Sequence, residues 1–328
     1  MTFLRKLDFW DMLLAGACLA VVLYAAVFVP NFLSAFNLSQ LAASASEKAL
    51  LILPMALLII TREIDLSVAS MLALTSVVFG LLVQAGVPTL LSIPLTLIAG
   101  GVLGAFNGYL VTAFGLQSLV VTLGTMALYR GIGYILLGSG SVNILPDAVV
   151  DFGIKNIPGT QIPWTIVPFL ILAPIFAVIL QKMPVGKRIY AIGGNPEVAK
   201  YSGINTKRMI LRLFITSGVV AGIAGIVYTA RLSNARANNA LGMELDVITI
   251  VLLGGISVFG GKGKLTGVLL ALVLIAVIRN VLALNQIGGD AQGMIIGLLL
   301  IGSLLAGNYW RSLQETLHRS RSLRGTKG

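Results

Sequence analysis

The side chains that most often carry out catalysis are scarce in this sequence. The single histidine, His318, lies in a basic C-terminal segment, and the single cysteine, Cys18, lies in an apolar run. There is no HExxH pattern, no cysteine cluster and no phosphate-binding loop of the GxxxxGK[ST] type. The glycine-rich segment 252–267 lacks the spacing of such a loop, and we interpret it as a tight reversal between two apolar runs. We therefore expect neither an enzyme nor a bound cofactor or metal.

More informative are ionisable residues that fall within apolar runs. Arg130 and Arg279 are the clearest cases, and Glu47 and Lys48 are further ones. A charged group inside a bilayer costs about 3 kcal/mol on insertion scales, so it usually faces protein or water. Arg130 and Arg279 could line a substrate path and donate hydrogen bonds to a polyol, or could reach lipid headgroups or pair with an acid. We find no acid clearly in the middle of an apolar run, which disfavours coupling to a proton or sodium gradient.

The elements that position these residues must be membrane-spanning helices. The chain has 328 residues, of which 57% are hydrophobic and 11% are charged, whereas soluble domains have about 25% charged residues. Apolar runs long enough to cross a bilayer as helices recur along the chain. We predict an all-α polytopic membrane protein, a single transmembrane domain over 1–328 with about ten spans. The predicted spans are 11–29, 41–61, 66–85, 89–112, 118–138, 163–181, 209–231, 244–259, 264–285 and 291–307.

Glycines recur at helical intervals within two of these runs. Such spacing lets two helix backbones approach closely in lipid, so we predict close helix packing through these positions. The two groups are Gly100, Gly101, Gly104 and Gly108 in one run, and Gly218, Gly222 and Gly225 in another.

The net charge of +11 indicates an orientation in the membrane. If the spans alternate from a cytoplasmic N-terminus, most of the 23 Lys and Arg residues lie on the cytoplasmic side, and only Lys155, Arg231 and Arg236 lie clearly outside. Basic residues favour the cytoplasmic side of a membrane protein. We therefore predict that both termini are cytoplasmic, that the basic tail 308–328 contacts anionic membrane lipid, and that the chain binds no nucleic acid.

One long hydrophilic segment, 182–208, interrupts the apolar runs and has the residues of a capped helix. Asn195 is a good N-cap, Pro196 suits the first helical position, and Glu197 favours the positive end of the helix dipole. Gly203 supplies a left-handed stop two turns later. The pattern predicts a short docking helix outside the bilayer, and the side chains that would share one of its faces are Val198, Tyr201 and Ser202.

Four segments together resemble a known family over nearly the whole chain. They are TREIDLSVASMLAL (61–74), VVTLGTMALYRGIGYILLGSG (120–140), GKRIYAIGGNPEVAKYSGIN (186–205) and VLLGGISVFGGKGKLTGVLLALVL (251–274). The chain resembles the permease subunits of ATP-binding-cassette sugar importers, the group of the ribose, xylose, rhamnose and autoinducer-sugar systems.

The resemblance implies a multi-pass permease of the bacterial inner membrane with a type II-like importer architecture, and it implies no cofactor. Its implied partners are an ATP-binding-cassette ATPase dimer, a periplasmic sugar-binding protein and a second permease copy or paralogue. Segment 182–208 is similar to the cytoplasmic coupling loop that touches the ATPase. The implied coupling residues are Gly194, Asn195, Pro196, Glu197, Ala199, Tyr201, Ser202 and Gly203.

In one place the chain departs from the family pattern. Arg62 and Glu63 stand where many ribose-type members have two glycines, so we do not expect the turn there to be as flexible. The first two segments are closer to the rhamnose and autoinducer-sugar branch, which favours rhamnose or another deoxyhexose as the sugar. The alternatives are a branched-chain amino acid or nucleoside permease of the same superfamily, or an ion-coupled secondary transporter.

Overall fold

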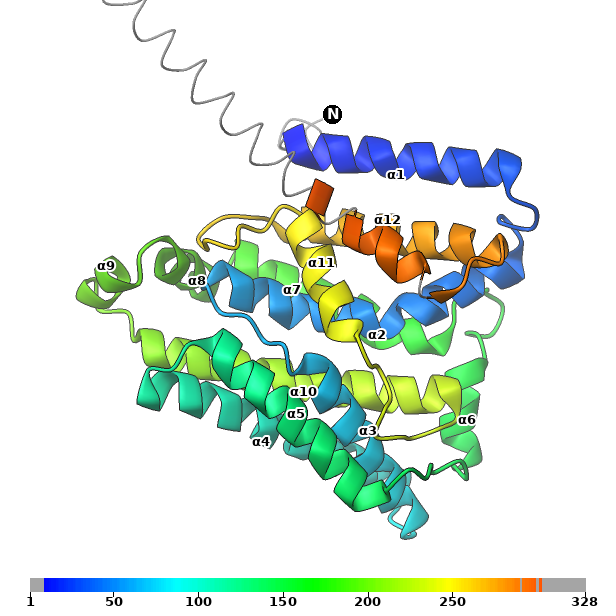
Figure 1. The fold of residues 1–328 in the computed structure, drawn as a ribbon, viewed down its shortest axis with the longest axis horizontal. Helices are drawn as coiled ribbons and strands as arrows, with labels where there is room; N and C mark the ends of the chain where they lie inside the picture. The colour runs from blue at the N-terminus through cyan, green and yellow to red at the C-terminus, as the bar shows by residue number, and fades with distance from the viewer. Residues whose placement is uncertain (1–8, 290, 299–300, 303–328) are drawn as a thin grey trace, which may run out of the picture.

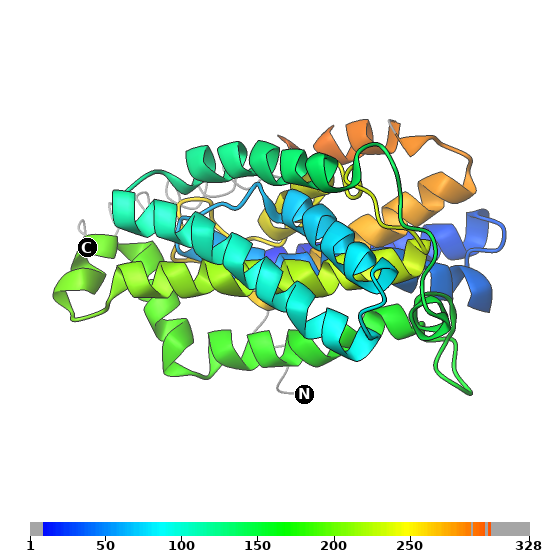
Figure 2. The same cartoon turned by 90° about the horizontal axis from the view of Figure 1, so that it is seen from below.

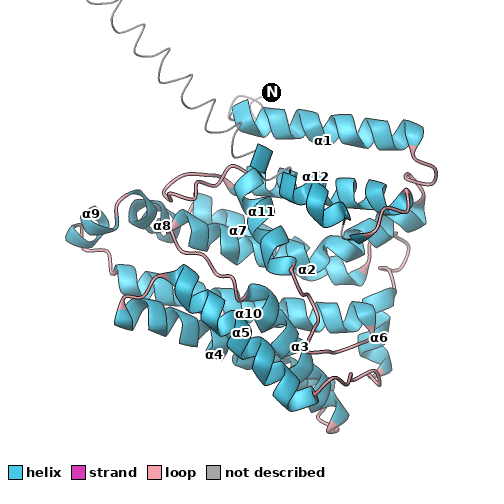
Figure 3. Cartoon of the chain, viewed as in Figure 1, coloured by secondary structure: helices cyan, strands magenta, loops and turns pink. Residues whose placement is uncertain are grey.

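The computed structural model describes residues 9–289, 291–298 and 301–302, and within them the chain is a bundle of helices (Figures 1 and 3). Apart from helices and loops, these residues contain two isolated β-bridges. The predicted all-helical fold is thus confirmed for the described part. The elements are α1 (Phe9–Phe28), α2 (Ala35–Ile60), α3 (Val68–Gln84), α4 (Thr89–Phe114), α5 (Ser118–Leu137), α6 (Asp147–Ile154), the short η2 (Trp164–Ile166), α7 (Val167–Gln181), α8 (Pro184–Gly194), α9 (Pro196–Tyr201), α10 (Thr206–Leu232), α11 (Met243–Leu253) and α12 (Leu265–Leu284).

Seven helical segments in the described residues are long and apolar enough to cross a membrane. They are Trp10–Phe28, Ala35–Ile60, Thr89–Phe114, Ser118–Leu137, Trp164–Gln181, Thr206–Leu232 and Leu265–Leu284. Each coincides with a predicted span. A further apolar helix, Val68–Gln84, is shorter. It corresponds to the predicted third span.

The predicted span at 244–259 is wrong in its length. The helix in this place, α11, has 11 residues, or about 17 Å at 1.5 Å per residue, too short for a hydrocarbon core of about 30 Å. It ends early because Gly255 takes a φ of +84°, a left-handed conformation that stops a helix. The predicted span 291–307 runs beyond the described residues, and residues 291–298 of it are helical. The predicted basic tail 308–328 also lies outside them.

The two ends of the bundle carry different elements (Figures 1 and 2). At one end, called the α9 end, lie α8, α9, the C-terminus of α2 and loop 257–263, which are joined by hydrogen bonds from Gly261 N to the Ile60 carbonyl and from the Tyr190 hydroxyl to the Gly263 carbonyl. At the opposite end, called the α6 end, Asn156 accepts a hydrogen bond from Ser39, near the start of α2.

Helices α2 and α10 form the centre of the bundle. The C-terminal half of α2 is almost wholly buried, and α10 packs against α2, α3 and α4. The contact of α10 with α4 depends on glycine. A Cβ atom added at Gly218 would lie 2.0 Å from the Gly100 carbonyl oxygen, and one added at Gly104 would lie 2.1 Å from the Phe214 carbonyl oxygen. The predicted close packing through these glycines is confirmed.

Segment 182–208 contains a helix that we did not predict. Besides the expected short helix, it forms α8, Pro184–Gly194, whose buried residues include Gly186, Ile189 and Ile192. Their spacing of three residues places them on one face of the helix. The sequence signal was present, but the polar residues around this narrow apolar stripe made the whole segment resemble a loop.

Candidate functional site

Helix α9 has the predicted caps at both ends. The Asn195 side-chain oxygen accepts hydrogen bonds from the backbone N–H groups of Glu197 (3.0 Å) and Val198 (3.1 Å). Pro196 is the first helical residue. At the other end Gly203 takes a φ of +81°, and the backbone of Ile204 bonds to the Ala199 carbonyl at 3.1 Å. This 6→1 hydrogen bond is typical of a helix that ends in a left-handed glycine.

The outer face of α9 exposes apolar side chains. Tyr201 is 90% exposed and Val198 is 59% exposed, whereas Ala199 is buried on the inner face. Glu197 is exposed as well. The Ser202 hydroxyl donates to the Val198 carbonyl within the helix. A tyrosine and a valine held out by a rigid, doubly capped helix beyond the apolar spans suit a protein interface.

A basic hollow lies beside α9. Its volume is about 320 Å³, and its lining includes Arg188 from α8 and Arg208 and Arg212 from α10. Within the described residues, none of these three arginines takes part in an ion pair. The arginines therefore leave positive charge uncompensated next to the exposed face of α9, which favours an acidic partner surface.

The C-terminal end of α8 connects α9 to the rest of the bundle. Arg62, in the turn after α2, donates from Nε to the Gly193 carbonyl and from Nη2 to the Gly194 carbonyl, both at 2.7 Å. The Tyr190 hydroxyl donates to Gly263 at 2.7 Å. Burial raises the pKa of the Tyr190 hydroxyl above its ordinary value. Sequence reasoning assigned no function to Arg62 or Tyr190, and only the departure at Arg62 from the family pattern pointed to this place.

Both arginines that we considered for a substrate path contact the chain around α11. Arg130, on α5, donates from Nη1 to the Ala237 and Asn239 carbonyls at 2.8 and 2.6 Å. These carbonyls belong to a non-helical segment between α10 and α11. Arg279, on α12, pairs with Asp246 in the first turn of α11. The structure thus places Arg130 and Arg279 around one short helix without bringing the two guanidinium groups together.

Arg279 also faces a cavity of about 240 Å³ between α2, α11 and α12. Lys48 lines the same cavity and bonds to Asp246 at 2.8 Å. Other polar residues of the lining are Ser44, Asn280 and Gln292. The cavity therefore combines hydrogen-bond donors with apolar walls, as small-molecule sites do.

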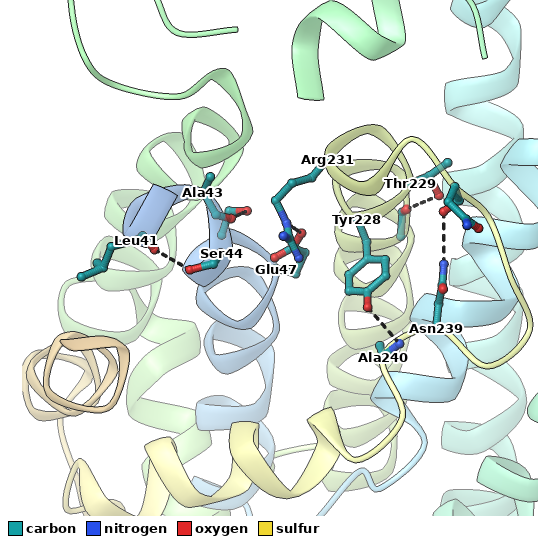
Figure 4. A network of polar contacts seen from close by, with 12 residues as sticks. Leu41, Ala43, Ser44, Glu47, Tyr228, Thr229, Arg231, Asn239 and Ala240 are labelled. Carbon is teal, nitrogen blue, oxygen red and sulfur yellow. Dashed lines mark hydrogen bonds and ion pairs between the residues drawn. The ribbon is translucent and has the colours of Figure 1, made fainter. Parts of the chain in front are cut away.

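The expectation that no acid lies in the middle of a span is wrong for Glu47. This residue is fully buried about halfway along α2, and its Oε1 accepts a 2.6 Å charged hydrogen bond from Arg231 of α10 (Figure 4). Its other oxygen, Oε2, has no hydrogen-bond partner among the residues that the structure describes. The sequence did not reveal the pair because Glu47 and Arg231 are far apart along the chain.

Comparisons with known proteins agree with a transport role. Residues 37–304 match the family described as "Branched-chain amino acid transport system / permease component". The chain is 36% identical over 299 residues to a D-allose transport system permease protein of Escherichia coli, covering 90% of this chain and 91% of that protein. It is 33% identical over 300 residues to a ribose import permease protein of Haemophilus influenzae, covering 89% and 91%.

A third relative is the L-arabinose transport system permease protein of Escherichia coli, 30% identical over 317 residues, with 96% of this chain and 95% of that protein covered. No solved structure matches the chain. The family match and these relatives cover most of the chain, which carries the spans, α9 and the arginines described above. The chain therefore belongs to the branched-chain-type family of bacterial transport permeases, as a multi-pass membrane subunit that is not itself an enzyme.

Proposed function

We propose that this chain is the membrane-embedded subunit of an ATP-binding-cassette importer for a monosaccharide, driven by a separate ATPase dimer that docks on α9. The observation that carries the proposal is the rigid, capped α9, which holds Tyr201 and Val198 out at one end of an apolar bundle. The names of the relatives, which refer to allose, ribose and arabinose, support a sugar as the substrate.

The proposed mechanism uses α9 as a lever. The α9 end faces the cytoplasm, and two copies of this chain, or this chain and a paralogue, form the pore. ATP binding closes the ATPase pair and moves both α9 helices. Because α8 is hydrogen-bonded to the turn after α2 and to loop 257–263, the movement reaches the spans and alternates access to the pathway. A periplasmic binding protein delivers the sugar at the α6 end.

The sugar path includes the cavity beside Arg279. Arg279 and Lys48 share a single acid, Asp246, so donors remain for the hydroxyl groups of a passing sugar. Arg130 supports the path by holding the non-helical backbone before α11, whose carbonyls would otherwise lack partners at membrane depth. The roles of Arg279 and Arg130 in the sugar path are proposals that substitutions at these two residues would test.

For the identity of the sugar, the sequence motifs and the relatives point to different compounds. The resemblance of the first two motifs favoured rhamnose or another deoxyhexose, and the relatives named above carry other sugars in their names. Uptake of labelled pentoses, hexoses and deoxyhexoses by a strain that lacks this chain identifies the sugar. Leucine and a nucleoside belong in the same panel, because the family description names branched-chain amino acids.

The docking role of α9 is tested by two substitutions in proteoliposomes that contain the ATPase and the binding protein. Glu197→Arg adds positive charge at the positive end of α9, the helix whose other end borders the basic hollow. Gly203→Pro cannot adopt the φ of +81° that Gly203 has. We expect both variants to insert in the membrane and to lose ATPase association and ATP-driven uptake.

The matched control is Asp147→Arg, which reverses an exposed acid in the first turn of α6 at the opposite end. This variant should retain ATPase association. Association and uptake that persist in Glu197→Arg and Gly203→Pro would refute the docking role.

The burial of Glu47 favours a second candidate function, an ion-coupled secondary transporter. Glu47 is a buried acid about halfway along a span, with one oxygen unpartnered. Such acids occur in the ion-coupling sites of secondary transporters. Uptake by the chain alone, driven by a proton or sodium gradient without ATPase or ATP, would support this second candidate over the first.

A further inference from the structure

The turn that follows α2 has an arginine at a position whose backbone conformation glycine adopts with less strain. Helix α2 ends with hydrogen bonds from Glu63 N to the Leu58 carbonyl (2.9 Å) and from Arg62 N to the Ile59 carbonyl (3.0 Å). This pair of bonds defines a Schellman motif, whose left-handed residue is usually glycine. Here that residue is Arg62, with a φ of +70°. A non-glycine residue is strained in this conformation, and the contacts of the Arg62 side chain can offset that cost.

The Arg62 side chain provides two bonds to the helix that carries α9. Its Nε and Nη2 atoms bond at 2.7 Å to the carbonyls of Gly193 and Gly194, the last two residues of α8. Carbonyls at a helix C-terminus have no partner within the helix and carry partial negative charge, which suits a cationic fork. Asn195, the N-cap of α9, follows immediately in the chain.

The backbones at this junction are in very close contact. Gly261 N donates to the Ile60 carbonyl at 2.8 Å, which joins loop 257–263 to the end of α2. A Cβ atom added at Gly193 would lie 1.7 Å from the Ile60 carbonyl oxygen and 2.4 Å from Gly261 N. One added at Gly260 would lie 2.4 Å from the Arg62 Cγ atom. The end of α2, the end of α8 and loop 257–263 thus meet at the Arg62 guanidinium.

We propose that Arg62 is a positioning residue for transport, which ties α8 and α9 to the end of α2 so that movement of α9 reaches the spans. This inference rests on the proposed function and adds a residue to it. Arg62 touches neither ATP nor sugar and acts through the Gly193 and Gly194 carbonyls. Without the two Arg62 hydrogen bonds, α9 still docks on the ATPase. When α9 then moves, α8 shifts relative to α2, and less of the movement reaches the spans.

Three substitutions separate the guanidinium from the backbone conformation. Arg62→Gly suits the φ of +70° and removes both donors. Arg62→Ala removes the donors and keeps the strain. Arg62→Lys keeps the charge without the planar fork. We expect sugar transported per ATP hydrolysed to fall at least threefold in Arg62→Gly and Arg62→Ala, and to recover in part in Arg62→Lys. ATPase association and the thermal midpoint of Arg62→Gly should equal those of the wild type or exceed them.

A second measurement needs neither ATPase nor sugar. In a Cys18→Ala background, Val198→Cys supplies one labelling site, because Cys18 is the only cysteine in the sequence and Val198 is exposed. A nitroxide at position 198 of the purified full chain should be more mobile when Arg62→Gly is added. Gly159→Ala, a change at a different position with positive φ, where a Cβ atom has open space among the described residues, should leave the label unchanged.

The outcomes separate this inference from the proposed function. Wild-type proteoliposomes without ATP-driven uptake would refute the proposed function, and the label would still report whether Arg62 restrains α9. Arg62→Gly with wild-type sugar transported per ATP, or with an unchanged nitroxide spectrum, would overturn the positioning role. A loss in Arg62→Ala that is absent in Arg62→Gly would assign the effect to backbone strain and would also overturn it.

Discussion

At the scale of single residues, two adjacent glycines at the end of α8 have different environments. Gly193 is buried where three backbones meet, and a Cβ atom there would overlap the Ile60 carbonyl. A Cβ atom added at Gly194 would have no other described atom within 4 Å, apart from its chain neighbours and its own helix backbone. The two residues are indistinguishable in the sequence, so the difference is a product of tertiary packing alone.

This difference predicts opposite effects of the same substitution. Gly193→Ala should lower the free energy of unfolding by about 1–3 kcal/mol, the usual cost of overpacking. Gly194→Ala should leave it unchanged or raise it slightly, because alanine is the better helix former. Thermal unfolding of the two purified variants in one detergent measures both effects. Equal midpoints for the two variants would contradict the close approach at Gly193.

The same limit applies to the charged residues within the apolar runs. The sequence indicated that Arg130, Arg279, Glu47 and Lys48 are unusual, because charge is rare in apolar runs. It could not supply their partners. Arg130 bonds to backbone carbonyls of a distant non-helical segment, and Glu47 pairs with Arg231, 184 residues away. Pairing across the bundle depends on how each helix is rotated, which periodicity does not determine when a run is apolar all round.

At the scale of elements, local signals predicted α9 well and α11 poorly. Asn195, Pro196 and Gly203 are capping residues whose effect is local, so their positions determine α9 before any packing is known. Helix α11 lies in an apolar run that is long enough for a span, and hydropathy says nothing about where such a run stops being helical. The helix ends at Leu253 because Gly255 takes a left-handed φ of +84°. A Cβ atom on Gly254 would overlap the backbone of Val268 in α12, so this turn is also a tertiary contact.

The contact between α4 and α10 gives a prediction at this scale. Gly218→Ala places a methyl group 2.0 Å from the Gly100 carbonyl oxygen and should force α4 and α10 apart, at a cost of about 1–3 kcal/mol. Gly131→Ala on α5 has open space and should be neutral or stabilising. Midpoints of thermal unfolding in detergent distinguish the two variants. A Gly218→Ala protein as stable as Gly131→Ala would mean that α4 and α10 do not approach this closely.

At the scale of the whole molecule, charge is distributed unevenly between the two ends. The basic residues of α8 and of the start of α10 lie at the α9 end, where Arg188, Arg208 and Arg212 surround one hollow. At the α6 end, Asp147 and Asp151 lie on α6, and Lys155 pairs with Asp151. Because basic residues favour the cytoplasmic side of a bilayer, this asymmetry supports the proposed orientation, with α9 inside the cell.

The orientation predicts opposite accessibility for two exposed side chains. Val198 on α9 is 59% exposed and Ile144, in the loop before α6, is 88% exposed. In a Cys18→Ala background, an impermeant maleimide added to spheroplasts should label Ile144→Cys and spare Val198→Cys. Inverted membrane vesicles should give the reverse, since only α9 then faces the reagent. Both sites must react in detergent, which shows that a negative result reflects sidedness. Labelling of Val198→Cys from outside the cell would place α9 on the side opposite a cytoplasmic ATPase. The proposed docking of the ATPase on α9 would then be refuted.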